Sequence, residues 1–361
     1  MKCIRFNQEA KYIKDFISLP KKLYTKKDNM EDSKTVSNLL LGNHPLSHYF
    51  TLNKFIVYKE KEVVGRFVIT EYPDDKKVCY IGFFECIDDK KVAKYIFENA
   101  YKYAKEKGYK KIVGPVDASF WNKYRLKINL FDKRPYTGEP YNKDYYYKMF
   151  LDNKYKVIEH YVSNIFERVD ESYNDPKFTA HYKEFKKLGY EIIKPERKDF
   201  DKCIEEIYYL IMDLYSTFPT FKKIEKEDFI KIFSSYKMII NMNMVRMAYY
   251  KGKAVGFCIS IPNYYNRVYQ LSWKQPLHLL HILYERKFPR EYIMPYLGAD
   301  RNHKGLGKAI AFSIAEELKK NNLPSINALI RDGNINLKYG EDKITNQYEY
   351  VLLERTIKWF I

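Results

Sequence analysis

Residues 296–310 read Tyr-Leu-Gly-Ala-Asp-Arg-Asn-His-Lys-Gly-Leu-Gly-Lys-Ala-Ile, and a helical pattern continues from them to Lys320. The stretch predicts a short strand ending near Ala299, a polar loop with Gly305 and Gly307, and then a helix. The helix carries an apolar residue at every fourth position, namely Leu306, Ile310, Ile314 and Leu318. Such a stripe is typical of a helix that packs one side on a core, so we expect a loop that leads into a buried helix.

The glycine-containing loop has the composition of an anion site. Glycines let the backbone approach a ligand closely, and the free N–H groups of a helix N-terminus attract negative charge. Two familiar phosphate-binding motifs do not match. A Walker loop needs Gly at position 302 and Ser or Thr after the lysine, where this chain has Asn302 and Ala309. The dinucleotide fingerprint needs a glycine where this chain has Ile310.

The run Asn302-His-Lys-Gly-Leu-Gly307 resembles the acyl-CoA pyrophosphate loop of the GNAT N-acetyltransferase superfamily, in which Gln or Arg normally stands where Asn302 is. The resemblance implies acetyl-CoA or another acyl-CoA as cofactor, bound by this loop and by the backbone of a splayed strand. A helix start that binds no ligand is the alternative. The implied cofactor contacts are Leu297, Ala299, Asn302, His303, Lys304, Gly305, Leu306, Gly307, Lys308 and Asn334.

The order of predicted elements occurs twice along the chain. The first copy comprises a hairpin, a strand, a helix and a strand at residues 55–69, 78–85, 92–107 and 110–113. The second copy has the same order at residues 245–261, 292–299, 306–321 and 325–330. A repeat of about 190 residues indicates two copies of one α/β fold. We therefore expect two domains, residues 1–168 and residues 169–361.

Three further runs are similar to a bacterial group of tandem GNAT-like proteins of unassigned substrate: Gly82-Phe-Phe-Glu-Cys86, Gly114-Pro115 and Pro140-Tyr-Asn142. The resemblance implies an α/β fold of two tandem GNAT-like domains, each a mixed, mostly antiparallel sheet flanked by helices. The chain departs from that group at residues 117–123, where small and acidic residues are usual and Asp-Ala-Ser-Phe-Trp-Asn-Lys stands here.

Only the second copy has a loop suited to CoA. The corresponding loop of the first copy, Cys86-Ile-Asp-Asp-Lys-Lys91, has no glycine and places two carboxylates where a pyrophosphate would lie. Like charges at that distance repel. We expect the first domain to be a degenerate copy, which either supplies a wall of the acceptor site or has a structural role.

Three residues are candidates for the chemistry of acyl transfer. Tyr339 stands where the GNAT family often keeps a tyrosine that protonates the leaving sulfur, although core packing is the alternative. Glu85, at the end of a first-domain strand, and Asp332 are candidate general bases, and a solvated carboxylate is the alternative for each.

Composition limits the compartment and the partners. The net charge of +18 is compatible with nucleic acid, an anionic membrane or an anionic cofactor, and AT-rich codon usage would also enrich lysine. No RNA-binding aromatic motif is present. Five scattered cysteines lack CxxC spacing, and we expect no metal. No signal peptide or long apolar run is found, so we expect a cytoplasmic protein.

A long insertion, residues 263–290, separates the second hairpin from the glycine-loop strand. His278 and His281 are three residues apart within it, but no third metal ligand is near in sequence. The insertion is compatible with a lid, a dimer contact or a helix on a membrane surface, and its mixed pattern favours a lid or a packed helix.

These features favour an acyl-CoA-dependent N-acyltransferase that acts on an amine of a small molecule or peptide. Two alternatives stay open at this point. One is a Fem-like aminoacyl transferase or other nucleic-acid-associated protein, which rests on the positive charge. The other is a non-catalytic CoA-binding module, since no base is evident.

Overall fold

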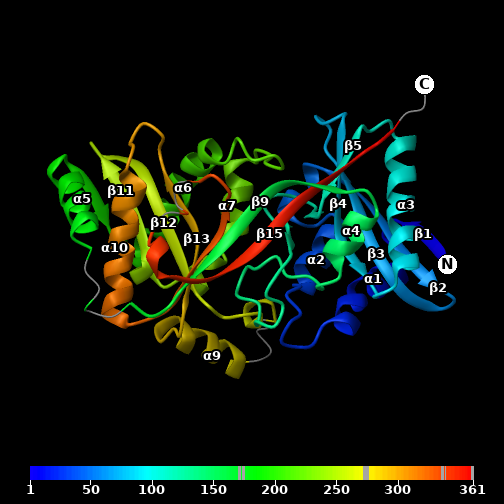
Figure 1. Cartoon of the computed structure of the whole chain (residues 1–361), viewed down its shortest axis with the longest axis horizontal. Helices are drawn as coiled ribbons and strands as arrows, with labels where there is room; N and C mark the ends of the chain where they lie inside the picture. The colour runs from blue at the N-terminus through cyan, green and yellow to red at the C-terminus, as the bar shows by residue number, and fades with distance from the viewer. Residues whose placement is uncertain (170–171, 173–174, 271–275, 335–336, 338, 359–361) are drawn as a thin grey trace. The chain divides into compact units, whose positions relative to one another are not determined.

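The computed structural model describes the chain except residues 170–171, 173–174, 271–275, 335–336, 338 and 359–361. The chain divides into two compact units (Figure 1): unit 1 is Met1–His160 with Glu349–Ile361, and unit 2 is Tyr161–Tyr348. None of the helices in the described part has both the length and the apolar composition that a bilayer span requires.

Unit 1 contains, in chain order, β1 (Lys2–Phe6), α1 (Ala10–Leu23), α2 (Ser33–Leu41), η1 (Pro45–His48), β2 (Thr51–Lys59), β3 (Glu62–Glu71), β4 (Val78–Cys86), α3 (Lys90–Glu106), β5 (Lys111–Gly114), β6 (Val116–Asp117), β7 (Lys123–Tyr124), β8 (Leu126–Lys127), α4 (Tyr146–Asp152) and the start of β9 (Lys156–Phe166). Its sheet has the order β1-β2-β3-β4-β5, with the end of β15 (Ile344–Thr356) beside β5. The β4–β5 pair is parallel, and the other pairs in this order are antiparallel.

Unit 2 continues with α5 (Pro176–Lys187), β10 (Tyr190–Ile193), η2 (Arg197–Asp199), α6 (Phe200–Leu214), α7 (Lys226–Phe233), α8 (Tyr236–Ile239), η3 (Met242–Met244), β11 (Val245–Tyr250), β12 (Lys253–Pro262), η4 (Arg267–Gln270), α9 (Pro276–Lys287), β13 (Tyr292–Ala299), α10 (Leu306–Asn321), β14 (Ser325–Arg331), η6 (Glu341–Lys343) and the start of β15. Its sheet has the order β10-β11-β12-β13-β14-β9. The β13–β14 pair is parallel and the others are antiparallel, so the topology of unit 1 is repeated.

In each unit the sixth strand of the order given above comes from the other half of the sequence. Strand β9 follows α4 of unit 1, yet its residues 161–166 pair with β14. Strand β15 ends the sequence of unit 2, yet its residues 353–356 pair with β5. The expected boundary at residues 168/169 lies near the first crossing, but the last segment of the chain belongs to unit 1. A repeat in the sequence predicts two contiguous domains and gives no sign of this exchange.

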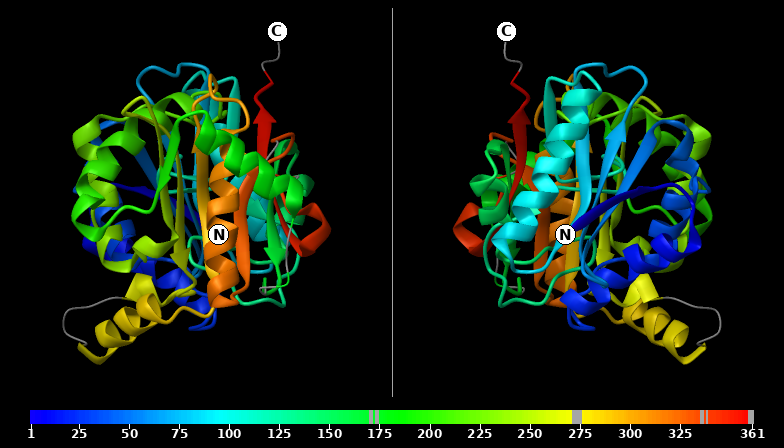
Figure 2. Two further views of the ribbon diagram at one scale, coloured as in Figure 1. Left: turned by 90° about the vertical axis from the view of Figure 1, so that its left-hand side faces the viewer. Right: turned by 90° about the vertical axis from the view of Figure 1, so that its right-hand side faces the viewer.

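Helices cover both faces of the unit 1 sheet (Figure 2). A Cβ atom added to Gly65 of β3 would lie 2.5 Å from Ile96 of α3. The next residue, Arg66, donates to the carbonyl oxygen of Phe16 in α1 at 2.7 Å. Because neighbouring residues of a strand point to opposite faces, α3 and α1 lie on opposite sides of the sheet.

The same arrangement holds in unit 2. A Cβ atom on Gly256 of β12 would lie 2.8 Å from Ile310 of α10. One on Gly298 of β13 would lie 2.6 Å from Leu214 of α6. Gly298 pairs with Phe257, the residue after Gly256, so α10 and α6 cover opposite faces of the sheet.

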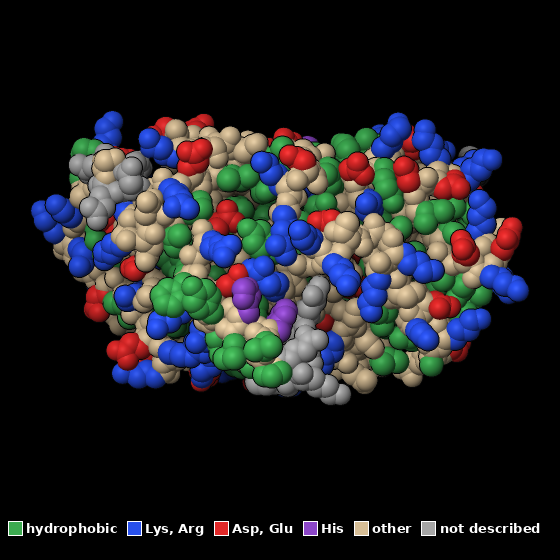
Figure 3. Space-filling model, turned by 90° about the horizontal axis from the view of Figure 1, so that it is seen from below, with side chains coloured by type: hydrophobic (Ala, Val, Ile, Leu, Met, Phe, Trp, Pro, Cys, Tyr) green, Lys and Arg blue, Asp and Glu red, His purple; other side chains and the backbone are tan. Residues whose placement is uncertain are grey.

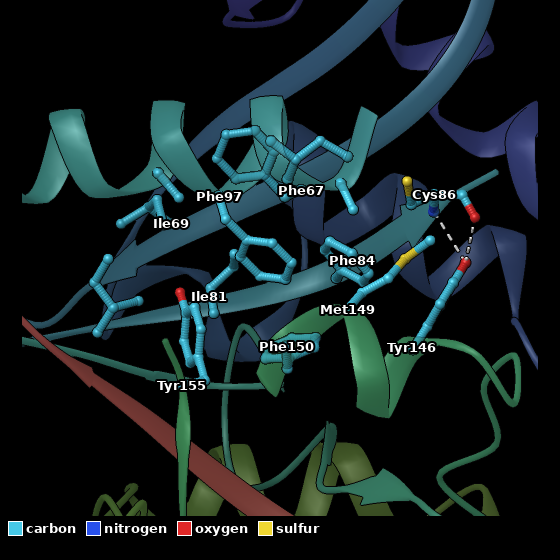
Figure 4. Packing of buried hydrophobic residues seen from close by; sticks show 14 of the residues in the cluster. Phe67, Ile69, Ile81, Phe84, Cys86, Phe97, Tyr146, Met149, Phe150 and Tyr155 are labelled. Carbon is cyan, nitrogen blue, oxygen red and sulfur yellow. Dashed lines mark hydrogen bonds between the residues drawn. The ribbon is translucent and has the colours of Figure 1, made fainter. Parts of the chain in front are cut away.

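The cores explain why these elements form. In unit 1, Phe84 of β4 and Phe150 of α4 pack on Phe97 of α3, with ring centroids 5.0 Å and 4.8 Å from that of Phe97 (Figure 4). In unit 2, the core against α10 contains all four residues of the predicted stripe: Leu306, Ile310, Ile314 and Leu318. The stripe and the buried helix are therefore confirmed.

Candidate functional site

Strands β13 and β14 diverge and open a slot in unit 2. They pair from Tyr292↔Ser325 to Met294↔Asn327 and then separate. The residue after Met294 is Pro295, which has no N–H to donate to a neighbouring strand. Beyond this point β13 continues on β12, and β14 resumes its pairing with β9 after a register shift. Leu329 lies in that irregular stretch with a φ of 58°.

The backbone of β13 turns polar groups toward the slot. Asp300 donates its N–H to the carbonyl oxygen of Val255 at 2.8 Å, so its amide points to β12. Because the amides of a strand alternate in direction, those of Leu297 and Ala299 point the other way, toward the open side. Both residues line a cavity of about 500 Å³, a size typical of ligand pockets.

The slot ends on the N-terminus of α10, which has no side-chain cap. The N-cap residue is Gly305, with a φ of 89° that favours glycine. No described acceptor receives the backbone N–H groups of Lys304, Gly305 or Gly307, whereas Leu306 donates to the carbonyl oxygen of His303. Three residues whose amides have no described acceptor therefore line the cavity beside the positive end of the helix dipole.

Side chains from two other elements brace this loop. The Nε2 atom of His181 in α5 lies 2.9 Å from the carbonyl oxygen of Gly305. The hydroxyl of Tyr190 in β10 lies 2.7 Å from Nδ1 of His303. Sequence reasoning missed both contacts, because nothing in the spacing of residues 181 and 190 points to a loop more than a hundred positions away.

The cavity wall is basic. Its described Lys and Arg side chains are Arg301, Lys304, Arg331 and Lys343. Asp300 is the single carboxylate among the described lining residues, and it accepts the N–H of Asn302 at 2.8 Å. Arg331 also lies 5.3 Å from the ring centroid of Phe218, which lines the same cavity. This excess of positive charge favours an anionic ligand.

Tyr339 lies at the end of the cavity beside the N-terminus of α10, which is called the anion end below. Its hydroxyl oxygen is 3.4 Å from where a Cβ atom of Gly307 would stand. Burial raises the pKa of Tyr339 above its ordinary value, so the hydroxyl is a hydrogen-bond donor at neutral pH. Asn334 lines the cavity as well and donates its backbone N–H to the carbonyl oxygen of Arg331 at 3.1 Å.

Five of the residues proposed from sequence do not line the cavity, four of them in unit 2 and the fifth, Glu85, in unit 1. The side chain of Leu306 is fully buried in the core. Asn302 is exposed at the turn, and Lys308 lies 5.6 Å above the ring of Phe178. Asp332 is exposed and accepts the N–H of its neighbour Gly333 at 2.8 Å.

Glu85 lies in unit 1, inside a buried polar network. It accepts hydrogen bonds from the hydroxyls of Tyr146 at 2.6 Å and Tyr24 at 3.0 Å. Burial raises its pKa to about 7, against the opposing effect of Arg66, whose guanidinium is 3.9 Å away. Its expected position at the end of a strand was right, but it is not among the residues that line the unit 2 cavity.

In unit 1 the chain itself fills the equivalent slot. Strands β4 and β5 pair only as far as Tyr80↔Val113, the same break as in unit 2. Strand β6 then packs against the rest of β4. A Cβ atom on Gly82 would lie 1.8 Å from the carbonyl oxygen of Val116. The carboxylate of Asp117 accepts the N–H of Phe83 at 2.5 Å.

The N-terminus of α3 in unit 1 is also satisfied internally. Asp89, the N-cap residue, accepts the N–H groups of Lys91 at 2.8 Å and Val92 at 3.4 Å. A carboxylate of the protein thus takes the position that an anionic ligand would take at a helix N-terminus.

Comparison with known proteins identifies this architecture. No protein-family model and no curated protein matches the chain. Over its whole length, however, the chain is similar to a tandem GNAT protein from the clavulanic acid biosynthesis pathway, of which it covers 99%, with a TM-score of 0.52 and 10% sequence identity. The chain has the tandem GNAT fold. The expected fold class is therefore confirmed.

A second solved structure with a GNAT fold agrees. It contains a GCN5-related glucosamine N-acetyltransferase region in a fungal multi-domain β-N-acetylglucosaminidase. The match covers 98% of this chain and 38% of that one, with a TM-score of 0.50 and 12% identity. Of the two GNAT-like units, unit 2 keeps an open slot with an uncapped helix, whereas in unit 1 both features are filled by the chain.

Replacing Asp89 tests the internal cap of α3. We expect Asp89→Ala to lower the free energy of unfolding by about 1 kcal/mol, because two amides lose their acceptor. Asp88→Ala removes the same charge from an exposed neighbour and should change it by less than about 0.5 kcal/mol. Urea unfolding of the full chain measures both. Equal losses of unfolding free energy in the two variants would show that the negative charge, and not the capping hydrogen bonds, stabilises the helix.

Proposed function

We propose that this protein is an acyl-CoA-dependent N-acyltransferase, which binds acetyl-CoA or a related acyl-CoA in unit 2 and acts on an amine acceptor. One observation carries the proposal: the slot between β13 and β14 is open and ends on an uncapped helix N-terminus. The tandem GNAT fold agrees with it.

The residues of unit 2 fit the parts of such a cofactor. The amides of Lys304, Gly305 and Gly307 suit a pyrophosphate, and the nearby lysine and arginine side chains suit its charge. The outward amides of Leu297 and Ala299 suit the amide groups of an extended pantetheine chain. We therefore retain these five residues as cofactor contacts and leave out Leu306.

Acyl-CoA supplies a thioester whose carbonyl carbon bonds to the amine nitrogen as the carbon–sulfur bond breaks, with one proton leaving the amine and one reaching the thiolate. The contribution of unit 2 is to hold and orient, which converts an encounter into an effectively unimolecular step. A β13 amide turned into the slot can also donate to the thioester oxygen, where negative charge develops.

Tyr339 has a different role in this proposal from the one that the family resemblance implies. Its hydroxyl lies beside Gly307, at the anion end of the cavity. We therefore assign it a hydrogen bond to the pyrophosphate, in place of proton donation to the leaving sulfur. A tyrosine hydroxyl is protonated at neutral pH at its ordinary pKa, and burial, which raises the pKa of Tyr339, extends its role as a donor to higher pH.

Substitution of Gly307 tests cofactor binding. In titration calorimetry we expect the wild-type protein to bind one acetyl-CoA per chain. Gly307→Glu should weaken binding by at least about tenfold, because its carboxylate enters the anion site.

The control variant, Gly307→Ala, keeps the fold and the backbone N–H of residue 307. In Gly307→Ala the new Cβ would stand at an ordinary contact distance of 3.4 Å from the Tyr339 hydroxyl, so affinity should stay within about threefold. Absence of binding to wild-type protein, or equal affinity of all three proteins, would overturn the site. Binding without release of free CoA thiol across a panel of amines would instead indicate a non-catalytic CoA-binding protein.

The role of Tyr339 is tested by Tyr339→Phe. We expect a roughly tenfold weaker affinity for acetyl-CoA, since hydrogen bonds to charged groups are worth about 1.5–3 kcal/mol, and a change in kcat below about threefold. Calorimetry gives the affinity and steady-state kinetics give kcat. A loss of kcat of a hundredfold or so with unchanged affinity would restore the proton-donor role.

A further inference from the structure

Helix α9 of unit 2 exposes its apolar side chains. Leu277, Leu280 and Tyr284 are 81%, 61% and 60% exposed, and Phe288, which follows the helix, is 52% exposed. At 100° per residue these four side chains lie within an arc of about 80°. Four of the ten large hydrophobic side chains exposed in the described chain are thus on this one face.

The opposite side of α9 anchors it to unit 2. Ile282 is fully buried and belongs to a small core with Tyr264. Glu285 is buried and forms an ion pair with Arg267, whose carbonyl oxygen lies 3.1 Å from Nε2 of His278. The helix therefore buries its single carboxylate and exposes several of its apolar residues, unlike an ordinary surface helix. Sequence patterning favoured a lid or a packed helix, and the structure shows a helix that packs on unit 2 through one side and leaves the other side exposed.

The charged residues of the α9 segment are mostly basic. Within residues 276–290 the single acidic residue is Glu285, which is paired, and the basic residues are Arg286, Lys287 and Arg290. Lys287 and Arg290 are exposed. Figure 3 shows hydrophobic side chains gathered on the face of the molecule that carries α9, with Lys and Arg side chains nearby. An apolar face with a basic rim complements an anionic, apolar surface.

We propose that the exposed face of α9 binds the surface of an anionic lipid bilayer. Leu277, Leu280, Tyr284 and Phe288 enter the boundary between headgroups and acyl chains, and Lys287 and Arg290 contact the headgroups. A helix of twelve residues is about 18 Å long, so it lies on the membrane and does not span it. This proposal is independent of the transferase activity.

Vesicle sedimentation with the full chain tests the proposal. The probes are large vesicles of phosphatidylcholine alone and of phosphatidylcholine with phosphatidylglycerol. We expect binding to the anionic vesicles that weakens as salt is raised, and little binding to the neutral ones. The double variant Leu280→Ser/Tyr284→Ser should lower the partition coefficient by at least about tenfold, because it removes half of the inserted side chains.

The matched control removes the same residue types from another exposed part of unit 2. Leu188 and Tyr209 are 57% and 62% exposed, and Leu188→Ser/Tyr209→Ser should leave vesicle binding unchanged. Three results would overturn the proposal. These are no wild-type binding to anionic vesicles, equal weakening by the two double variants, or a dimer in light scattering that only the α9 variant dissociates. Thermal melting of both variants separates lost binding from lost folding.

Discussion

The break in parallel pairing after Met294 and Asn327 is the constraint on which the unit 2 site depends. Pro295 has no amide hydrogen with which to extend the pairing. In β14, Leu329 lies with a positive φ in the irregular stretch before that strand pairs with β9 again. Once the strands part, β13 still pairs with β12, but its backbone groups on the β14 side have no strand partner. The helix that follows begins at Gly305 without a side-chain cap, and the N–H groups of Lys304, Gly305 and Gly307 have no described acceptor. The unpaired backbone groups of β13 and the uncapped N-terminus of α10 together suit an extended, anionic ligand.

The two units meet the same constraint differently. In unit 1 the strands also part, after Tyr80 and Val113, but β6 occupies the gap and Asp89 caps the helix. Unpaired buried amides are costly, and unit 1 satisfies its own with groups from the same chain. In unit 2 the corresponding amides have no described acceptor. Two units with the same fold therefore do not have the same open slot. The slot depends on a few residues near the point where the two parallel strands of each unit separate.

The sequence predicted the structural features that depend on interactions between residues close together in the chain. The apolar stripe and the glycine loop follow from spacing and helix geometry. The assignment of Leu297 and Ala299 to the cofactor came from the resemblance to the GNAT family and stays a prediction. The exchange of β9 and β15, the β6 insert and the bracing by His181 and Tyr190 were not predicted, because each joins residues far apart in sequence. The burial of Glu85 and the solvent-facing side of α9 depend on tertiary packing in the same way.

Selective ¹⁵N-glycine labelling with acetyl-CoA titration tests the contrast between the two units most directly, since the chain has 14 glycines in all. The amide resonances of Gly305 and Gly307 should shift as ligand binds, because their N–H groups gain an acceptor. Those of Gly65 and Gly82 in the filled unit should stay in place. Shifts at Gly82 with none at Gly305 and Gly307, or no shifts at any glycine, would contradict the placement of the cofactor in unit 2.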